Sequence, residues 1–139
     1  MYDKILVTLE ATPTDRAIID HVKALAAVMH SRVVLLHVAD GWAARTYGPD
    51  AVSPEVTDDQ AYLEKVRVEF QSAGIGAEVE LAYGDPGKEI LKWIKRKGCD
   101  LVAMSTHGHG FMGDLIFGTT ARQVRHGVTV PVLLLRAKK

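Results

Sequence analysis

The sequence has very little cysteine: Cys99 is the only one among 139 residues. One thiol excludes an internal disulfide and a zinc-finger framework, both of which need paired cysteines. A chain without disulfides fits a reducing compartment, so a cytoplasmic location is expected. Nothing in the sequence beside Cys99 indicates an activated thiolate, and we expect an inert small side chain there.

Neither sign of charge is in excess, because 17 basic residues balance 17 acidic ones. A balanced chain has no global basic field to attract nucleic acid, so no nucleic-acid partner is expected. Long apolar runs are also missing. The run Ile5–Val7 is much shorter than a signal peptide requires, and no other run reaches the length of a membrane span. We therefore expect one domain, over residues 1–139, that has no membrane partner.

The chain does contain a regular alternation of short apolar runs and segments with helical periodicity. Continuous apolar runs of this kind are typical of strands that are covered on both faces of a sheet. The five strands are expected at Ile5–Val7, Arg32–Ala39, Ala77–Tyr83, Asp100–Met104 and Val130–Leu135. The four helices are expected from Pro13 to His30, from Asp59 to Gly74, from Pro86 to Gly98 and from Ala121 to Val128.

The start of the first helix carries its own signal. Thr12 is expected to cap it, Pro13 to occupy its first position, and Asp15 to complete a capping box. Gly41–Asp59 has no sustained period and is expected to be a long loop. Trp42 in that loop is expected to pack on the local surface.

Strands that alternate with helices predict an α/β protein, a single Rossmann-like domain with a five-stranded, largely parallel sheet and four helices on both faces. In Ala77–Tyr83 acids alternate with apolar residues, which favours a strand at the edge of the sheet. A strand order of 3-2-1-4-5 then puts the reversal of winding between strands one and four. Open sheets of this kind bind ligands at the carboxyl ends of the strands, at that reversal.

The stretch Ser105–Thr120 follows the fourth expected strand and holds four glycines ahead of a helical pattern. Glycines let backbone N–H groups approach a phosphate closely, and a helix start adds unpaired donors. This indicates a nucleotide site. The series Gly108-x-Gly110-x-x-Gly113 matches the dinucleotide fingerprint. That fingerprint belongs in the first strand-to-helix turn of its fold, whereas this series follows the fourth strand, so we interpret the match as incidental. Gly84–Lys88 is too short for a P-loop and is interpreted as a turn and helix cap.

Gly108, nine further residues, and then Gly118-Thr119 form a spacing that resembles the nucleotide-binding members of the universal stress protein family. The resemblance extends over the chain through Lys4–Val7, Leu36–Val38, Gly84–Pro86, Asp100–Gly108 and Pro131–Leu134. It implies that ATP, or AMP or ADP, binds at the carboxyl ends of strands one and four of a stress-response protein that acts as a sensor or signalling dimer. Mg²⁺ or Mn²⁺ would arrive with the phosphates of the nucleotide.

The resemblance also implies a role for each matching residue. The triphosphate and ribose would be wrapped by Gly108, Gly110, Gly118, Thr119 and Thr120. The backbone of Val38 would meet adenine, Glu10 would stand near the ribose where the family usually has aspartate, and Thr8 and Met104 would line the base pocket. The sequence departs from the family pattern at Ser105, which replaces the first glycine, and at His109, where Lys or Arg is frequent.

Two other interpretations stay open. A dimeric interaction module of the same fold that binds no nucleotide would suit Ser105 and His109. An enzyme that forms an adenylated intermediate would need an acid or base, for which Glu10 and His107 are the candidates. No nucleophile and base pair is evident, so at most slow ATP hydrolysis is expected. His107 and His109 lack the further ligands that a protein metal site needs.

The last expected strand, Val130–Leu135, is apolar on both faces although the strand order puts it at an open edge. Such an edge invites pairing with another chain. The family resemblance implies a homodimer through this strand, and lysine at Leu133 and Leu135 is expected to produce a monomer. Trp93, on the third expected helix, is expected to be partly buried.

Overall fold

The structure, a computed structural model, describes residues 1–39, 54–107 and 122–137, except for the side chains of residues 54–57, 107 and 137. In chain order the elements are β1 (Lys4–Thr8), α1 (Asp15–Met29), β2 (Arg32–Ala39), α3 (Pro54–Ser72), β3 (Ala77–Tyr83), α4 (Pro86–Lys97), β4 (Leu101–His107) and β5 (Val132–Ala137). Residues 122–127 form a further helical segment.

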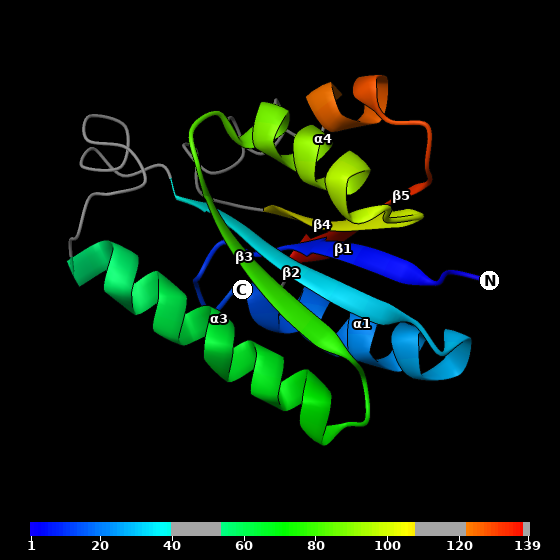
Figure 1. Ribbon diagram of the computed structural model, residues 1–139, viewed down its shortest axis with the longest axis horizontal. Coiled ribbons are helices and arrows are strands. Elements are labelled where there is room, and N and C mark those ends of the chain that lie inside the picture. Colours follow the sequence, from blue (N-terminus) through cyan, green and yellow to red (C-terminus); the bar gives the residue numbers. More distant parts are fainter. Residues whose placement is uncertain (40–53, 108–121, 138–139) are drawn as a thin grey trace.

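The five strands form one sheet in the order β3-β2-β1-β4-β5, and every pairing in it is parallel. The predicted α/β fold and the predicted strand order are therefore confirmed. Figure 1 shows α1 and α3 on one face of the sheet, and α4 with the helical segment 122–127, in orange, on the other. The strand with alternating acids, β3, lies at one edge and β5 at the other.

Two hydrophobic cores fill the spaces above and below the sheet. Side chains alternate between the faces of a strand, so Ile5 and Val7 join the core beneath α1 and α3 while Leu6 joins the core beneath α4. All three are fully buried. The central strand is thus covered on both faces, as its continuous apolar run predicts.

Two helices begin at residues other than those predicted. α1 begins at Asp15 rather than at Pro13, and the residue before it, Thr14, makes no side-chain cap. The predicted capping box is wrong because the Asp15 carboxylate turns back to the loop instead, as described below. α3 begins at Pro54, so the end of the expected loop Gly41–Asp59 is helical.

The other helix ends follow their local signals. Asp85 caps α4, since its carboxylate accepts a hydrogen bond from the backbone N–H of Lys88 at 3.0 Å. Gly98 ends this helix at φ +67°, and His30 ends α1 in the same left-handed conformation.

The last two strands end later than predicted, at His107 and Ala137. β4 continues past Met104 to His107 because β5 remains paired with it. β5 begins at Val132 rather than at Val130, and Pro131, which has no N–H to donate, contributes only its carbonyl oxygen to Val102. Within the described ranges, none of the helices has both the length and the apolar character needed to cross a membrane.

Candidate functional site

β1 is the first of the central strands to end. Its ladder with β2 ends at the pair of Thr8 and Leu36, whereas β2 continues beside β3 to Ala39. Its ladder with β4 ends at Val7 and Ala103, whereas β4 continues beside β5 to His107. The chain reverses its winding between β1 and β4, and the neighbours of β1 on both sides extend beyond it. This is the position where open parallel sheets bind ligands.

Three of the predicted site residues lie on one face of the sheet at these strand ends. Thr8 of β1 pairs with Leu36 of β2, two residues before Val38. Val7 of β1 pairs with Ala103 of β4, and Thr8 and Met104 are the next residues of these two strands. Alternation puts the three side chains on the face covered by α4. Thr8 and Met104 are buried and Val38 is partly exposed. Met104 is fully buried in the core beneath α4, and Val38 packs at its edge.

Ser105, which replaces the family glycine, is the next residue of β4 and is 3% exposed. Its hydroxyl is buried and has no hydrogen-bond partner in the part of the chain that the structure describes. A buried hydroxyl without a partner costs about 1–3 kcal/mol. By alternation along β4 its side chain faces α1 and α3, on the opposite side of the sheet from Met104.

The loop that carries Glu10 is held by a buried carboxylate. Asp15 is completely buried, and it accepts hydrogen bonds from the backbone N–H of Glu10 at 3.0 and 3.1 Å and from that of Ala11 at 2.9 Å. Ala11 has a φ of +63°, a strained value for a residue with a Cβ. The Glu10 carboxylate in turn accepts a hydrogen bond from the Thr14 hydroxyl at 3.0 Å. The loop after β1 is thus a fixed turn whose conformation depends on Asp15.

α3 supports this turn from outside. The hydroxyl of Tyr62 donates to Asp15 at 2.7 Å. Burial, and then the hydrogen bond to Asp15, raises the pKa of Tyr62 well above its ordinary value, so the phenol keeps its proton and remains a donor. His37 of β2 adds a second connection. Its Nδ1 donates to the carbonyl oxygen of Leu9 at 2.7 Å, and its Nε2 lies 3.2 Å from the Asp59 carboxylate.

Sequence reasoning did not predict this support. Tyr62 and Asp59 are 47 and 22 residues away from the groups that they contact, Asp15 and His37. The only local signal was an acidic residue at the start of α1, which suggested a capping box. Contacts across such separations become visible only when β1, β2 and α3 are packed together.

Several predicted site residues lie outside the described residues: Gly108, His109, Gly110, Gly118, Thr119 and Thr120. Trp42 lies outside them as well. Among the residues that are described, no three His, Cys, Asp or Glu side chains gather as metal ligands would. Cys99 is buried, and burial raises the pKa of its thiol to about 11, so it stays protonated and inert as predicted.

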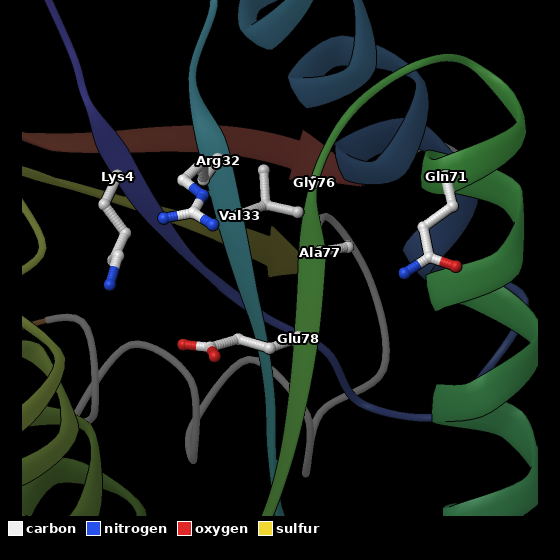
Figure 2. A pocket seen from close by; sticks show the side chains of 7 residues that line it. All are labelled: Lys4, Arg32, Val33, Gln71, Gly76, Ala77 and Glu78. Carbon is white, nitrogen blue, oxygen red and sulfur yellow. The ribbon is translucent and has the colours of Figure 1, made fainter.

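A separate pocket lies at the other ends of the strands, where β1, β2 and β3 begin (Figure 2). It has a volume of about 270 Å³ and is lined by Lys4, Arg32, Val33, Gln71, Gly76, Ala77 and Glu78. Its two cations share the pocket with the carboxylate of Glu78, which also pairs with Lys97 at 3.4 Å. Glu78 offsets only one of the two positive charges, and none of the lining residues belongs to the predicted site.

The sequence and the fold of this chain are similar to those of known proteins over almost their full length. The chain is 25% identical to the universal stress protein YxiE of Bacillus subtilis, over 98% of this chain and all of the relative. The solved structure of MJ0577, from Methanocaldococcus jannaschii, matches with a TM-score of 0.82 at 25% identity, over 100% of this chain and 99% of that one.

A universal stress protein from Archaeoglobus fulgidus, solved in complex with dAMP, matches with a TM-score of 0.70 at 15% identity, over 96% of this chain and 97% of that one. At 15% identity, the similarity to the A. fulgidus protein shows that the two chains share a fold. The sequence model of the universal stress protein family matches residues 1–136, almost the whole chain. The chain described here therefore belongs to the universal stress protein family.

Proposed function

We propose that this protein binds an adenine nucleotide, ATP or its products AMP and ADP, at the carboxyl ends of β1 and β4. The observation that carries the proposal is the early end of β1 between two strands that continue past it. The winding of the chain also reverses between β1 and β4, and open parallel sheets bind ligands at such a reversal. The dAMP complex of the A. fulgidus relative supports an adenine nucleotide as the ligand class.

Different groups of residues would contact the base, the ribose and the phosphates. The side chains of Thr8, Val38 and Met104 share the α4 face, and the base would meet the backbone of Val38 at the end of this face. Glu10 stands on the turn held by Asp15, where it would meet the ribose. The triphosphate and ribose would be wrapped by Gly108, Gly110, Gly118, Thr119 and Thr120. Mg²⁺ or Mn²⁺ would come with those phosphates, since oxygen ligands suit both ions.

We further propose that the protein works as a sensor or signalling dimer in the cytoplasm and not as a fast enzyme. The Glu10 carboxylate already accepts a hydrogen bond from Thr14, so it is engaged in holding its own turn. Slow hydrolysis of bound ATP is the most that we expect.

Mass spectrometry of the small molecules released from freshly purified protein tests the proposal, followed by calorimetric titration with ATP and Mg²⁺. We expect a retained adenine nucleotide and measurable binding heat. The variant Gly110→Asp puts a negative charge among the proposed phosphate contacts and should weaken ATP binding at least about tenfold, because the added carboxylate would repel the charged phosphates.

The matched control is Gly76→Asp, the same substitution just before β3, at the opposite ends of the strands from the proposed site. Gly76 is exposed, and a Cβ there would meet only the Arg32 side chain, at 3.7 Å, so the variant should fold and bind ATP normally. Absence of retained nucleotide together with absence of heat at millimolar ATP would overturn the proposal. It would favour the alternative, an interaction module of the same fold, for which Ser105 is the supporting observation.

A further inference from the structure

The balanced charge of the whole chain conceals a strong segregation across the sheet. α4 contains five basic residues and one acidic residue, and the helical segment 122–127 adds Arg122 and Arg125 on the same face. On the opposite face, α3 has five acidic residues and two basic ones. The sequence therefore encodes a basic layer and an acidic layer within a neutral chain.

The basic residues of α4 form one exposed stripe. Lys88, Lys92, Lys95 and Arg96 are all exposed, and their spacing of three and four residues keeps them on one side of the helix. Ile90 and Ile94 on the other side are buried. Lys88 and Arg96 lie about 12 Å apart along the axis, at a rise of about 1.5 Å per residue.

The helical segment 122–127 extends this stripe sideways. It packs closely on α4, since a Cβ at Gly87 would lie 2.1 Å from the Gln123 side chain and one at Gly127 would lie 2.8 Å from Leu91. Arg122, Arg125 and His126 are exposed on it. We call the exposed residues Lys88, Lys92, Lys95, Arg96, Arg122 and Arg125 the basic surface.

Most of this charge is not compensated by the residues that the structure describes. Lys92 pairs with Glu89 at 3.4 Å, and Lys97, beside the basic surface, pairs with Glu80 at 3.0 Å. Over the described residues no salt bridge is formed by Lys88, Lys95, Arg122 or Arg125.

Helix stability does not explain the stripe. Cations at the end of α4 favour the helix dipole, but Lys88 lies in the first turn, where a cation is unfavourable. Lys88 with Lys92, and Lys92 with Arg96, are like charges four residues apart, an arrangement that destabilises a helix. The stripe therefore suits an anionic partner better than it suits the helix itself.

We infer that the basic surface binds an acidic segment of a partner protein. An acidic helix with carboxylates at every fourth residue repeats its charge about every 6 Å, which matches the spacing along α4. Charge complementarity of this kind supplies specificity and association rate.

Two other anionic partners fit less well. Single-stranded nucleic acid needs aromatic rings for its bases, but Trp93 is partly buried, with Lys92, Arg96 and Lys97 over its ring at 5.1 to 5.7 Å. A membrane surface needs apolar side chains beside the cations. The large hydrophobic residues that are exposed in the described ranges are Met1, Val28, Val68 and Leu134, and none lies on α4 or on residues 122–127.

Fluorescence anisotropy with a labelled deca-glutamate peptide tests the inference at low salt, where we expect saturable binding. The double variant Lys88→Gln/Lys95→Gln removes two charges that form no salt bridge with any described residue. It should weaken binding roughly threefold to tenfold, because two exposed charge contacts are lost with little change in packing. The matched control, Lys65→Gln/Arg67→Gln, removes the same charge from α3 on the opposite face and should change the affinity less than about twofold. Circular dichroism verifies that both variants fold.

Three outcomes would overturn the inference. These are no peptide binding at low salt, equal losses in the two double variants, and tighter binding of a ten-nucleotide oligothymidine or of anionic vesicles than of the peptide. The last result would assign the basic surface to nucleic acid or to a membrane. None of these measurements requires bound nucleotide, so the inference stands or fails separately from the proposed function.

Discussion

At the scale of single residues, Asp15 contributes most to the shape of the candidate site. Its carboxylate is completely buried, yet it is fully occupied by two backbone N–H groups and the Tyr62 hydroxyl. Hydrogen bonds to a charged group are roughly twice as strong as neutral ones. The turn that carries Glu10, with its left-handed Ala11, therefore depends on one acid from α1.

We predict that Asp15→Asn lowers the free energy of unfolding by about 2 kcal/mol, because an amide keeps the shape but presents an NH₂ group to donors. Tyr62→Phe should cost about 1 kcal/mol, since it removes only one of these hydrogen bonds. Urea unfolding measures both values.

Asp20→Asn is the control for this prediction. Asp20 belongs to the same helix, but its side chain is 60% exposed, and the change should cost less than about 0.5 kcal/mol. If Asp15→Asn were as stable as the wild type, the turn would have to be held by other contacts.

At the scale of elements, a carboxylate of α3 lies between two cations of α1, in addition to the hydrogen bond between Tyr62 and Asp15. Glu69 of α3 accepts hydrogen bonds from Arg16 and, at 2.6 Å, from Lys23, both on α1. The hydrogen bond from Arg16, the one from Lys23 and the nearby charges lower the pKa of Glu69, against the opposing effect of burial. A lowered pKa means that the charged carboxylate favours the folded state.

This pairing predicts a pH dependence with a definite sign. Because the folded pKa lies below the unfolded one, the stabilisation is fully present above the unfolded value and is lost as pH falls through the folded value. Glu69→Gln should therefore lower the free energy of unfolding by roughly 0.5–1 kcal/mol at about pH 7, within the range of partly exposed pairs.

At about pH 3 the variant and the wild type should differ much less. Thermal melts of both proteins at the two pH values provide the comparison. A difference of the same size at acidic pH would show that Glu69 acts through packing and not through its charge.

At the scale of the whole molecule, the open edge at β5 bears on assembly. Among the described strands, β5 pairs with β4 on one side only. Leu133 and Leu135 pack against the core beneath α1 and α3, whereas Leu134 is 39% exposed. Lysine at Leu133 and Leu135, suggested by the sequence, would damage the fold as well as any interface, so it is not a clean test of assembly.

We predict that the protein is a homodimer through β5 and that Leu134→Lys makes it monomeric, because a charge at an exposed strand edge opposes pairing. Sedimentation equilibrium measures the change. Val68→Lys on α3, where Val68 is 51% exposed, is the control and should remain a dimer. A Leu134→Lys protein that stays dimeric would place the interface elsewhere.

Much of the fold could be predicted from the sequence because it is encoded in local periodicity. Short apolar runs such as Ile5–Val7 identify buried strands, and the alternating acids of β3 identify an edge. Asp85 and Gly98 mark the ends of α4 since a cap acts within one turn. The spacing from Gly108 to Gly118 and Thr119 likewise suggested the family, and the match over residues 1–136 shows it.

The tertiary structure alone decided how distant residues act together. Asp15 signalled a capping box, but packing against Tyr62 and the turn at Glu10 and Ala11 turned it into a clamp for the site. The neutral sum of charges excluded only a global basic field, whereas the fold brings the cations of α4 and of residues 122–127 together on one face. Periodicity acts over a few residues, while contacts and surfaces depend on which elements the sheet brings together.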